Sequence, residues 1–236
     1  MAPTRIFPSN RRLTGSRKSG TRNQDVTRQM LYRLSDQLAL KTRWRPYRAR
    51  PGELVLVLRT TAVFPPAHPS TRLCLDLLKE VLATGPLPPR GLLDVGCGSG
   101  VLLLAAAAAG LGPAVGVDLS RRAVLMSREN ARENGLAPAV HLVQGSTECL
   151  RGPFALILAN LPLPVQLAKV AELSRLASPD GCLVLSGFKD SQEDELLARY
   201  REAGWSLRRR LTREEWAIEL PPDKSFNWVG WWLEPA

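Results

Sequence analysis

The sequence predicts an α/β fold built on a parallel sheet, and three observations lead to this prediction. A short apolar run enters a glycine-rich turn and continues into an alanine-rich stretch, from Leu92 to Ala109, which reads as strand, tight turn and helix. A second apolar run ends in an acid at Asp118. A third, from Phe154 to Asn160, is apolar almost throughout, as in a central strand covered on both faces.

The glycine turn has the pattern Asp94-x-Gly96-x-Gly98-x-Gly100. Glycine lets the backbone turn sharply and lets a ligand approach where a Cβ would collide. A dinucleotide fingerprint requires glycine or alanine where Val101 stands, and no Lys-Ser or Lys-Thr pair follows to make a phosphate-binding P-loop. The pattern that remains resembles the first motif of the S-adenosylmethionine (SAM) methyltransferases, and the competing interpretation is a glycine turn of another α/β protein.

The next two strands support a nucleoside site. Asp118 follows Asp94 by 24 residues and ends the run that begins at Ala114, where a carboxylate can accept hydrogen bonds from a ribose diol. The third strand runs from Val140 to the turn at Gly145 and Ser146, where enzymes of this kind cover the adenine. Many of them have an acid there, so Ser146 or Gln144 would have to contact the adenine.

Asn160 ends the fourth strand, at the edge of the sheet where open α/β proteins bind ligands. Its amide can accept a hydrogen bond from an attacking amine. The alternative is that Asn160 caps a helix predicted from Leu163 to Ala177. A fifth strand, a helix and further strands are predicted over Cys182–Gly187, Gln192–Ala203, Trp205–Leu207, Trp216–Leu220 and Asn227–Leu233. We expect Trp228, Trp231 and Trp232 to pack in a terminal hairpin rather than to stack on nucleic acid.

Several segments together resemble the PrmA-type ribosomal protein methyltransferases, over roughly Val63 to Trp216. The segment His68-Pro69-Ser70-Thr71 ahead of the glycine turn is the most particular, and the other matching segments are Leu92–Gly100, Leu158–Asn160, Pro179–Gly181 and Leu185–Gly187. The resemblance implies a Rossmann-like fold with a seven-stranded, mostly parallel sheet, an antiparallel C-terminal hairpin and helices on both faces. It also implies SAM as cofactor and amines of large-subunit ribosomal protein eleven as substrates.

The resemblance assigns roles to the motif residues. Asn160 and His68 are the expected catalytic residues, where Asn160 orients the amine and His68 either relays its proton or is a turn residue bonded to the backbone. The expected cofactor-binding residues are Thr71, Asp94, Gly96, Gly98, Gly100, Asp118, Gly145 and Ser146. No metal site is expected, because the chain has only two histidines and its four cysteines form no Cys-x-x-Cys pair.

The chain departs from the family in three places. Pro65-Pro66-Ala67 replaces a Gly-Thr-Gly-Thr run, and we expect the family's N-terminal substrate-recognition domain to be missing. Asn160-Leu161-Pro162-Leu163 replaces the usual asparagine, isoleucine and leucine, and this pattern is typical of enzymes that methylate planar nitrogens. Three hypotheses therefore stay open: a protein amine methyltransferase, an RNA base methyltransferase, and a non-catalytic SAM-fold binding module.

The positive charge is concentrated at the N-terminus. Residues 1–50 contain 13 Lys and Arg against 2 acids, whereas residues 51–236 contain 19 against 20. We predict an arm over residues 1–50, disordered from Met1 to Gln24 and with one possible helix from Asp25 to Leu40, followed by a methyltransferase domain over 51–236. The arm could contact rRNA, could be an organelle-targeting leader, or could be a solvated tail.

Composition bounds the remaining possibilities. At 236 residues the chain suits one domain with an appended arm. No apolar run approaches the ~20 residues of a membrane-spanning helix, and no signal peptide is visible. The cysteines lie in apolar settings and are expected to be reduced, so we predict a cytoplasmic protein unless the Arg-rich N-terminus targets an organelle. The sequence does not indicate the oligomeric state.

Overall fold

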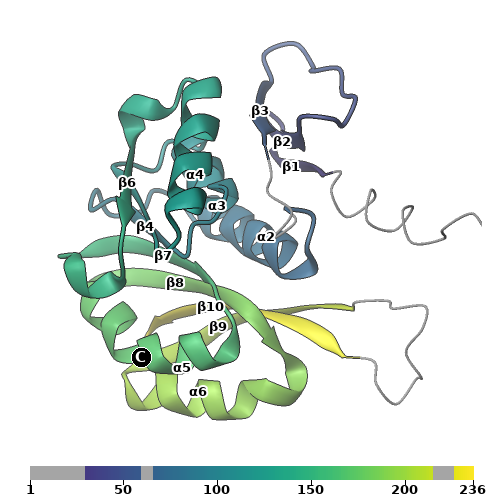
Figure 1. The fold of residues 1–236 in the computed structure, drawn as a ribbon. Helices are drawn as coiled ribbons and strands as arrows, with labels where there is room; N and C mark the ends of the chain where they lie inside the picture. Colours follow the sequence, from purple (N-terminus) through teal and green to yellow (C-terminus); the bar gives the residue numbers. More distant parts are fainter. Residues whose placement is uncertain (1–29, 60–65, 215–225) are drawn as a thin grey trace, which may run out of the picture.

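The protein contains a large seven-stranded sheet with helices on both faces, and a separate small sheet above it (Figure 1). This computed structural model describes residues 30–59, 66–214 and 226–236. The arm from Met1 to Gln24 and the strand predicted at Trp216–Leu220 lie outside these ranges. Among the described residues, no helix combines the length and the apolar character needed to cross a bilayer.

The large sheet has the strand order β6-β5-β4-β7-β8-β10-β9. Neighbouring strands from β6 to β8 are parallel. The pairs β8–β10 and β10–β9, at the other edge of the sheet, are antiparallel. The seven-stranded, mostly parallel sheet with a C-terminal hairpin is therefore confirmed. Its strands are β4 (Leu92–Val95), β5 (Ala114–Asp118), β6 (Val140–Gln144), β7 (Phe154–Asn160), β8 (Ala177–Lys189), β9 (Trp205–Glu214) and β10 (Asn227–Pro235).

The helices begin and end at the residues that favour such ends. Ser120 caps the helix α4 by accepting a hydrogen bond from the Ala123 N–H, and the chain leaves α4 at Asn134-Gly135 with a φ of 69° at Gly135. His68 caps α2, whose first residue is Pro69. The helices are α2 (Pro69–Ala83), α3 (Val101–Ala108), α4 (Arg121–Glu133), α5 (Leu163–Leu176) and α6 (Glu193–Glu202), with short 3-10 turns at Ala137–Ala139, Thr147–Cys149 and Asp190–Gln192.

The strand order places a switch point between β4 and β7. From β4 the chain moves outward to β5 and β6, and then returns to the other side of β4 to form β7. The connections that leave β4 and β7 therefore diverge, and a crevice opens beyond the carboxyl ends of these two strands. The glycine turn follows β4 and Asn160 ends β7, so both candidate sites of the sequence lie at this crevice.

The small sheet corrects the helix prediction for Asp25 to Leu40 over residues 30–40, the part that the structure describes. In place of a helix, β1 (Leu31–Ser35) and β2 (Leu38–Thr42) form an antiparallel pair, and β3 (Leu54–Leu58) adds parallel to β2. Burial along β1 alternates, with Tyr32 and Leu34 buried between more exposed neighbours, so the period is two and not 3.6. The apolar β3 requires a strand partner, and this tertiary pairing overrides the helical spacing. The sheet takes strands from both sides of the predicted boundary at residue 50.

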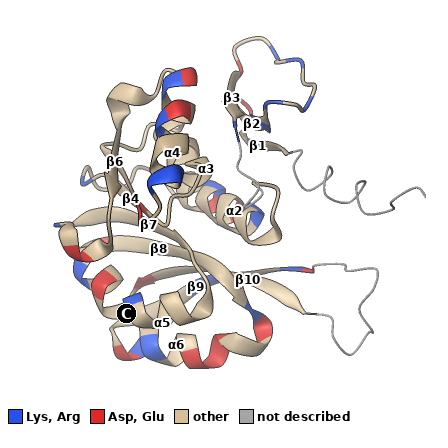
Figure 2. Ribbon diagram, in the orientation of Figure 1, with Lys and Arg blue, Asp and Glu red and all other residues tan. Residues whose placement is uncertain are grey.

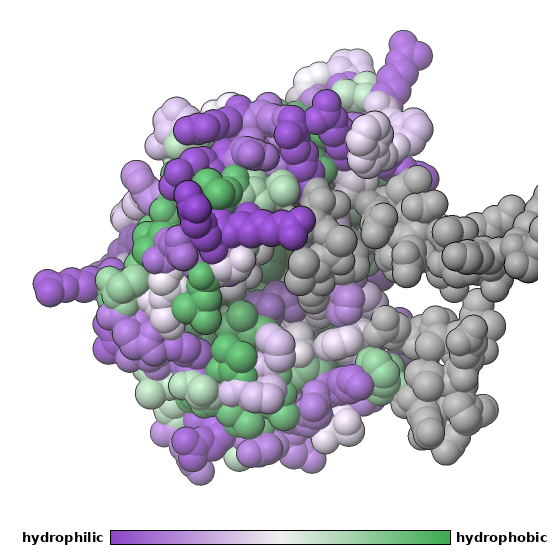
Figure 3. Space-filling view, viewed as in Figure 1, coloured by the Kyte–Doolittle hydropathy of each residue, from purple (hydrophilic) through white to green (hydrophobic). Residues whose placement is uncertain are grey.

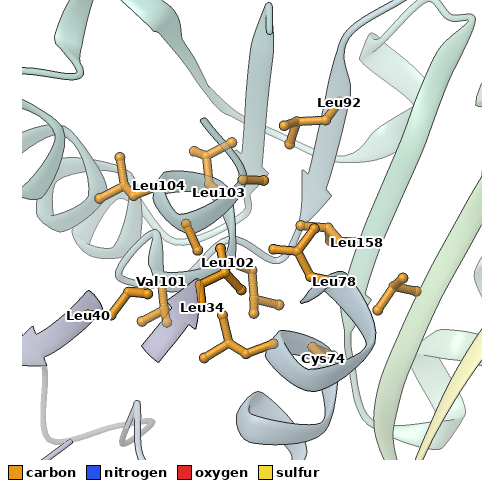
Figure 4. Close-up of a cluster of buried hydrophobic side chains, with 14 of the residues drawn as sticks. Leu34, Leu40, Cys74, Leu78, Leu92, Val101, Leu102, Leu103, Leu104 and Leu158 are labelled. Carbon is orange, nitrogen blue, oxygen red and sulfur yellow. The ribbon is translucent and has the colours of Figure 1, made fainter. Parts of the chain in front are cut away.

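Leucines of the small sheet pack directly on the large domain. Figure 4 shows Leu34 and Leu40 beside Val101 and Leu102 of α3, with Leu78 of α2 close by. All five belong to one buried cluster. The small sheet is thus part of the core and not a flexible appendage. The hairpin tryptophans Trp231 and Trp232 are also buried, as predicted.

Asn130 of α4 and Asn134, which directly follows this helix, fix β3 in place. The Asn134 side chain accepts from the Val57 N–H at 2.7 Å and donates to the Val57 carbonyl at 2.9 Å. Asn130 makes the same pair of bonds with Arg59, at 2.8 and 2.9 Å, and also donates to the Ser99 carbonyl of the glycine turn at 2.8 Å. Asn130 therefore connects the small sheet to the turn that follows β4.

We expect Asn134→Ala to destabilise the protein by about 1–3 kcal/mol, because both polar groups of Val57 lose their side-chain partner. Urea unfolding measures the loss, and hydrogen exchange should show reduced protection of the Val57 amide. Arg128→Ala, an exposed position on the same helix, is the control and should change neither. Unchanged protection at Val57 would show that the clamp does not hold β3.

Candidate functional site

A cavity of about 460 Å³ lies at the switch point between β4 and β7. Its lining includes most of the predicted site residues, namely Thr71, Asp94, Gly96, Gly98, Asp118, Gly145, Ser146 and Asn160. The predicted residues Gly100 and His68 are not part of this lining. Figure 3 shows hydrophobic side chains in a band down this face of the molecule, and the cavity residues Leu119 and Val165 are 75% and 40% exposed. An apolar, partly open cavity with a few polar groups is the usual form of a small-molecule site.

The three glycines of the turn all have left-handed backbone conformations, with φ of 70°, 57° and 81° at Gly96, Gly98 and Gly100. A Cβ on Gly100 would lie 2.8 Å from the Ser127 hydroxyl, so Gly100 is required for packing. A Cβ on Gly98 would meet nothing closer than the Gly96 carbonyl at 3.9 Å. The space beside Gly98 is therefore open to a ligand that approaches the backbone.

Asp118 ends β5 and faces the turn. Its Oδ2 accepts from the Gly98 N–H at 3.0 Å, and its Oδ1 accepts from the Ser120 N–H at 2.8 Å. A carboxylate offers about four lone-pair positions, so each oxygen can accept one further hydrogen bond from a ligand hydroxyl. Asp118 thus both fixes the glycine turn and offers two acceptors at the cavity.

Asp94 lies at the base of the cavity, with only 2% of its surface exposed. Its Oδ2 accepts from the Leu103 N–H of α3 at 3.0 Å, which fixes the turn from behind. Burial raises the pKa of Asp94 to about 8, against an ordinary value of 3.8, and the nearby charge of Asp118 acts in the same direction. Asp94 therefore holds its proton in the folded protein at neutral pH.

This shift predicts a pH-dependent stability. Between about pH 4 and pH 8 the Asp94 carboxyl ionises in the unfolded chain but keeps its proton in the folded one, so its contribution to stability is complete below pH 4 and is lost as the pH rises to 8. We expect Asp94→Asn, which cannot ionise, to flatten the decline of the unfolding free energy over this range. Urea unfolding at pH 5 and pH 8 measures it, with Asp194→Asn on the exposed face of α6 as control. An identical decline in Asp94→Asn and the unaltered protein would contradict the assignment.

The turn after β6 forms the far wall of the cavity. Gly145 donates its N–H to the Asp118 carbonyl at 3.0 Å, and the Ser146 hydroxyl accepts from Lys169 Nζ of α5 at 2.9 Å. The same ammonium bonds Glu148, and these contacts lower the pKa of Glu148 to about 2. Thr147 also lines the cavity, and its buried hydroxyl has no partner among the described residues. Gln144 is exposed and does not line the cavity, so of the two residues predicted to contact adenine only Ser146 lines it.

Asn160 lies across the cavity from this wall. Its Nδ2 donates to the Thr71 hydroxyl of α2 at 3.3 Å, whereas its buried Oδ1 has no hydrogen-bond partner among the described residues. The cap of α5 is Pro162, which excludes the alternative that Asn160 is a helix cap. A buried acceptor without a partner costs free energy unless a ligand satisfies it. Oδ1 is therefore available to a hydrogen-bond donor that enters the cavity.

His68 lies beside this region in an aromatic row. Its Nδ1 accepts from the Ser70 N–H at 3.3 Å, so the observed contact is the capping of α2, one turn before Thr71. Its ring meets Trp228 edge-on at 4.7 Å between centroids, Trp228 meets Phe226 at 5.7 Å, and Lys189 Nζ lies 3.6 Å above the Phe226 ring. The proton-relay role of His68 stays a prediction.

The sequence did not identify several residues of the site. Leu119, Arg122 and Val165 line the cavity, and Lys169 orders Ser146 from another helix. The position of Leu119 directly after the strand-ending Asp118 could have indicated that it lines the cavity. The contact of Lys169 depends on how α5 packs and has no such local signal. Among the described residues no His, Cys, Asp and Glu cluster could hold a metal ion. All four cysteines are free, and Cys149 is exposed, although the sequence predicts an apolar setting for it.

The sheet order and the glycine turn at its switch point define a Rossmann-like methyltransferase fold. A solved ribosomal protein L11 methylase from Lactobacillus delbrueckii subsp. bulgaricus aligns with a TM-score of 0.70 and 23% identity, over 87% of this chain and 97% of that one. A SAM-dependent methyltransferase from Geobacter sulfurreducens, solved with S-adenosyl-L-homocysteine, aligns with a TM-score of 0.55 and 16% identity, over 70% and 91% of the two chains. At these identities the likeness establishes the fold.

The chain belongs to the ribosomal protein L11 methyltransferase (PrmA) family, whose model matches residues 30–220. Relatives named ribosomal protein L11 methyltransferase include one from Syntrophotalea carbinolica, 32% identical over 79% of this chain and 61% of that protein, and one from Geotalea daltonii, 34% identical over 86% and 64%. The chain thus spans somewhat less than two thirds of the length of these relatives. The resemblance drawn from the motifs is confirmed at the level of the family.

Proposed function

We propose that this protein is a SAM-dependent N-methyltransferase that methylates an amine of a ribosomal protein. The single observation that carries the proposal is the buried, unpartnered Oδ1 of Asn160 in the cavity of a PrmA-family fold. An acceptor at this place suits a substrate that presents an N–H. A ribosomal substrate is consistent with activity in the cytoplasm.

The residues present fit the cofactor. Open space beside Gly98 admits a ligand against the backbone, and Asp118 offers two acceptors to a ribose diol. The exposed Leu119 and the turn at Ser146 flank the cavity where an adenine would lie. SAM, when bound, supplies an activated methyl group on a sulfonium. We propose that Asp118 and the glycine turn would hold it in the cavity that Asn160 also lines.

The remaining chemistry is positioning of the amine. A lysine has a reference pKa of about 10.4, so it must lose a proton before it can attack. The mostly apolar walls of the cavity favour the neutral amine, because burial disfavours its charged form. Asn160 Oδ1 then accepts one N–H and directs the nitrogen lone pair into the cavity, while Thr71 fixes the amide. His68 supports this arrangement by capping the helix that carries Thr71.

The aromatic row suits the approach of such an amine. Lys189 Nζ lies 3.6 Å from the centre of the Phe226 ring, and Trp228 and His68 continue the row toward α2. Aromatic faces attract a cation at this range. We propose that the substrate side chain passes along His68 and Trp228 before it reaches Asn160.

The test is incubation of the purified protein with methyl-labelled SAM and ribosomes that have not been methylated, followed by separation of protein from RNA. We expect label in protein, and mass spectrometry of tryptic peptides then gives the residue. Label in RNA would overturn the proposal in favour of base methylation, which the Asn-Leu-Pro-Leu segment from Asn160 to Leu163 would then explain. Cofactor binding without label in either fraction would indicate a binding module.

A further inference from the structure

The loop between β2 and β3 carries a cluster of arginines that the proposed function does not use. It contains Arg43, Trp44, Arg45, Tyr47, Arg48 and Arg50, and no acid occurs between Asp36 and Glu53. Figure 2 shows these basic positions along the loop at the outer edge of the small sheet. Trp44 is 81% exposed, the most exposed large hydrophobic residue of the described chain, and the Arg43 guanidinium lies 5.9 Å from its ring centre.

The loop is held in shape by its own side chains. Lys41 Nζ donates to the carbonyls of Arg43 and Arg45, the second at 2.9 Å. At the other end, the Glu53 carboxylate accepts from the Tyr47 hydroxyl and from the Arg50 N–H at 2.9 Å. Arg33 of β1 bonds the same carboxylate, so Glu53 is already fully engaged by the small sheet and its loop. The loop contains no other acid that could pair with its arginines.

Within the described residues, no carboxylate forms an ion pair with Arg45, Arg48 or Arg50, and Arg43 meets only Glu133, at 4.0 Å. We propose that this loop is a contact site for single-stranded RNA. Guanidiniums bind phosphate oxygens, and an exposed indole gives an unpaired base a surface on which to stack. Arginine with an exposed aromatic residue suits RNA better than an acidic protein face, which would need the charge but not the exposed ring.

The position of the loop fixes its role. Glu133, which meets Arg43, is at the carboxyl end of α4, whereas Arg122 at the amino end of the same helix lines the cavity. At 1.5 Å per residue these two positions are roughly 16 Å apart along α4. A base stacked at the loop therefore lies outside the cavity, and we assign the loop the role of a tether. The inference stands whichever group is methylated.

The experiment is fluorescence anisotropy with the full chain, without SAM, and a labelled 12-nucleotide single-stranded RNA. We expect Trp44→Ala to weaken binding about tenfold, with Trp44→Phe close to the unaltered protein, because the ring is the stacking surface. Arg45→Ala with Arg48→Ala should lower the slope of log affinity against log salt by about 1.4 in magnitude, as expected for two lost phosphate contacts. Arg199→Ala with Arg201→Ala on α6 removes the same charge elsewhere and is the matched control.

Two results would overturn the inference. One is RNA affinity that falls equally in the loop and control variants, which would mean that only net charge matters. The other is a Trp44→Ala variant with unchanged RNA affinity but lost binding to phosphatidylserine vesicles or to a poly-glutamate peptide, measured in parallel. Because no methyl transfer is measured, failure here leaves the proposed activity standing, and failure of the activity leaves this result standing.

Discussion

Asn160→Ala should lower kcat for methyl transfer about a hundredfold or more while leaving cofactor affinity within about threefold. Among the described residues, Asn160 Oδ1 and the Thr147 hydroxyl are the buried side-chain oxygens of the cavity without a partner, and Asn160 is the one that ends β7. Misplacement of a reacting nitrogen by about 1 Å can cost a factor of this size. Single-turnover kinetics with labelled SAM measures the chemical step, and calorimetry with the SAM analogue sinefungin measures binding.

Two further variants separate orientation from general disturbance. Thr71→Val keeps the shape of the buried side chain but removes the hydroxyl that accepts from Asn160 Nδ2, so we expect a smaller loss of kcat. Ser191→Ala, exposed near the same edge of the sheet, should behave as the unaltered protein. Equal kcat for Asn160→Ala and the unaltered protein would remove Asn160 from the mechanism.

Asp118→Ala should weaken sinefungin binding by about 1–3 kcal/mol, because charge-assisted hydrogen bonds to the ligand are lost. The variant also releases the Gly98 and Ser120 N–H groups, which Asp118 now holds at 3.0 and 2.8 Å, so the glycine turn becomes looser. Calorimetry at constant pH gives the affinity.

Asp194→Ala on α6 removes an equal charge far from the cavity and serves as the control. Asp118→Asn keeps the shape but not the charge, and its affinity should lie between the two. If Asp118→Ala binds sinefungin as tightly as the control, the ribose does not lie against β5.

The sheet and its cavity were predictable because their signals are local. The apolar run before Asp94, the glycine turn and the strand-ending Asp118 are each complete within a few residues, and the fold places them together at one switch point. Asn160 was predictable for the same reason, since a polar residue that ends an apolar strand has few structural uses.

What could not be predicted depends on distant partners. The spacing of apolar residues from Asp25 to Leu40 fits a helix, but β2 pairs with β3, more than ten residues further on, and β1 pairs with β2. The contact of Lys169 with Ser146 likewise depends on how α5 packs on the sheet. The capping role of His68 was among the alternatives, because Pro69 marks a helix start within the sequence itself.

Asn130 makes the small sheet and the cavity thermodynamically dependent on each other. One amide side chain, fully buried, satisfies both Arg59 after β3 and Ser99 in the turn that faces the cavity. A macromolecule that displaces β3 on docking would break the bonds between Asn130 and Arg59, and we expect the loss to reach the crevice through Ser99. By linkage, a nucleoside in the crevice would then alter affinity for that macromolecule by the same factor. Docking and filling of the crevice are in this sense coupled equilibria.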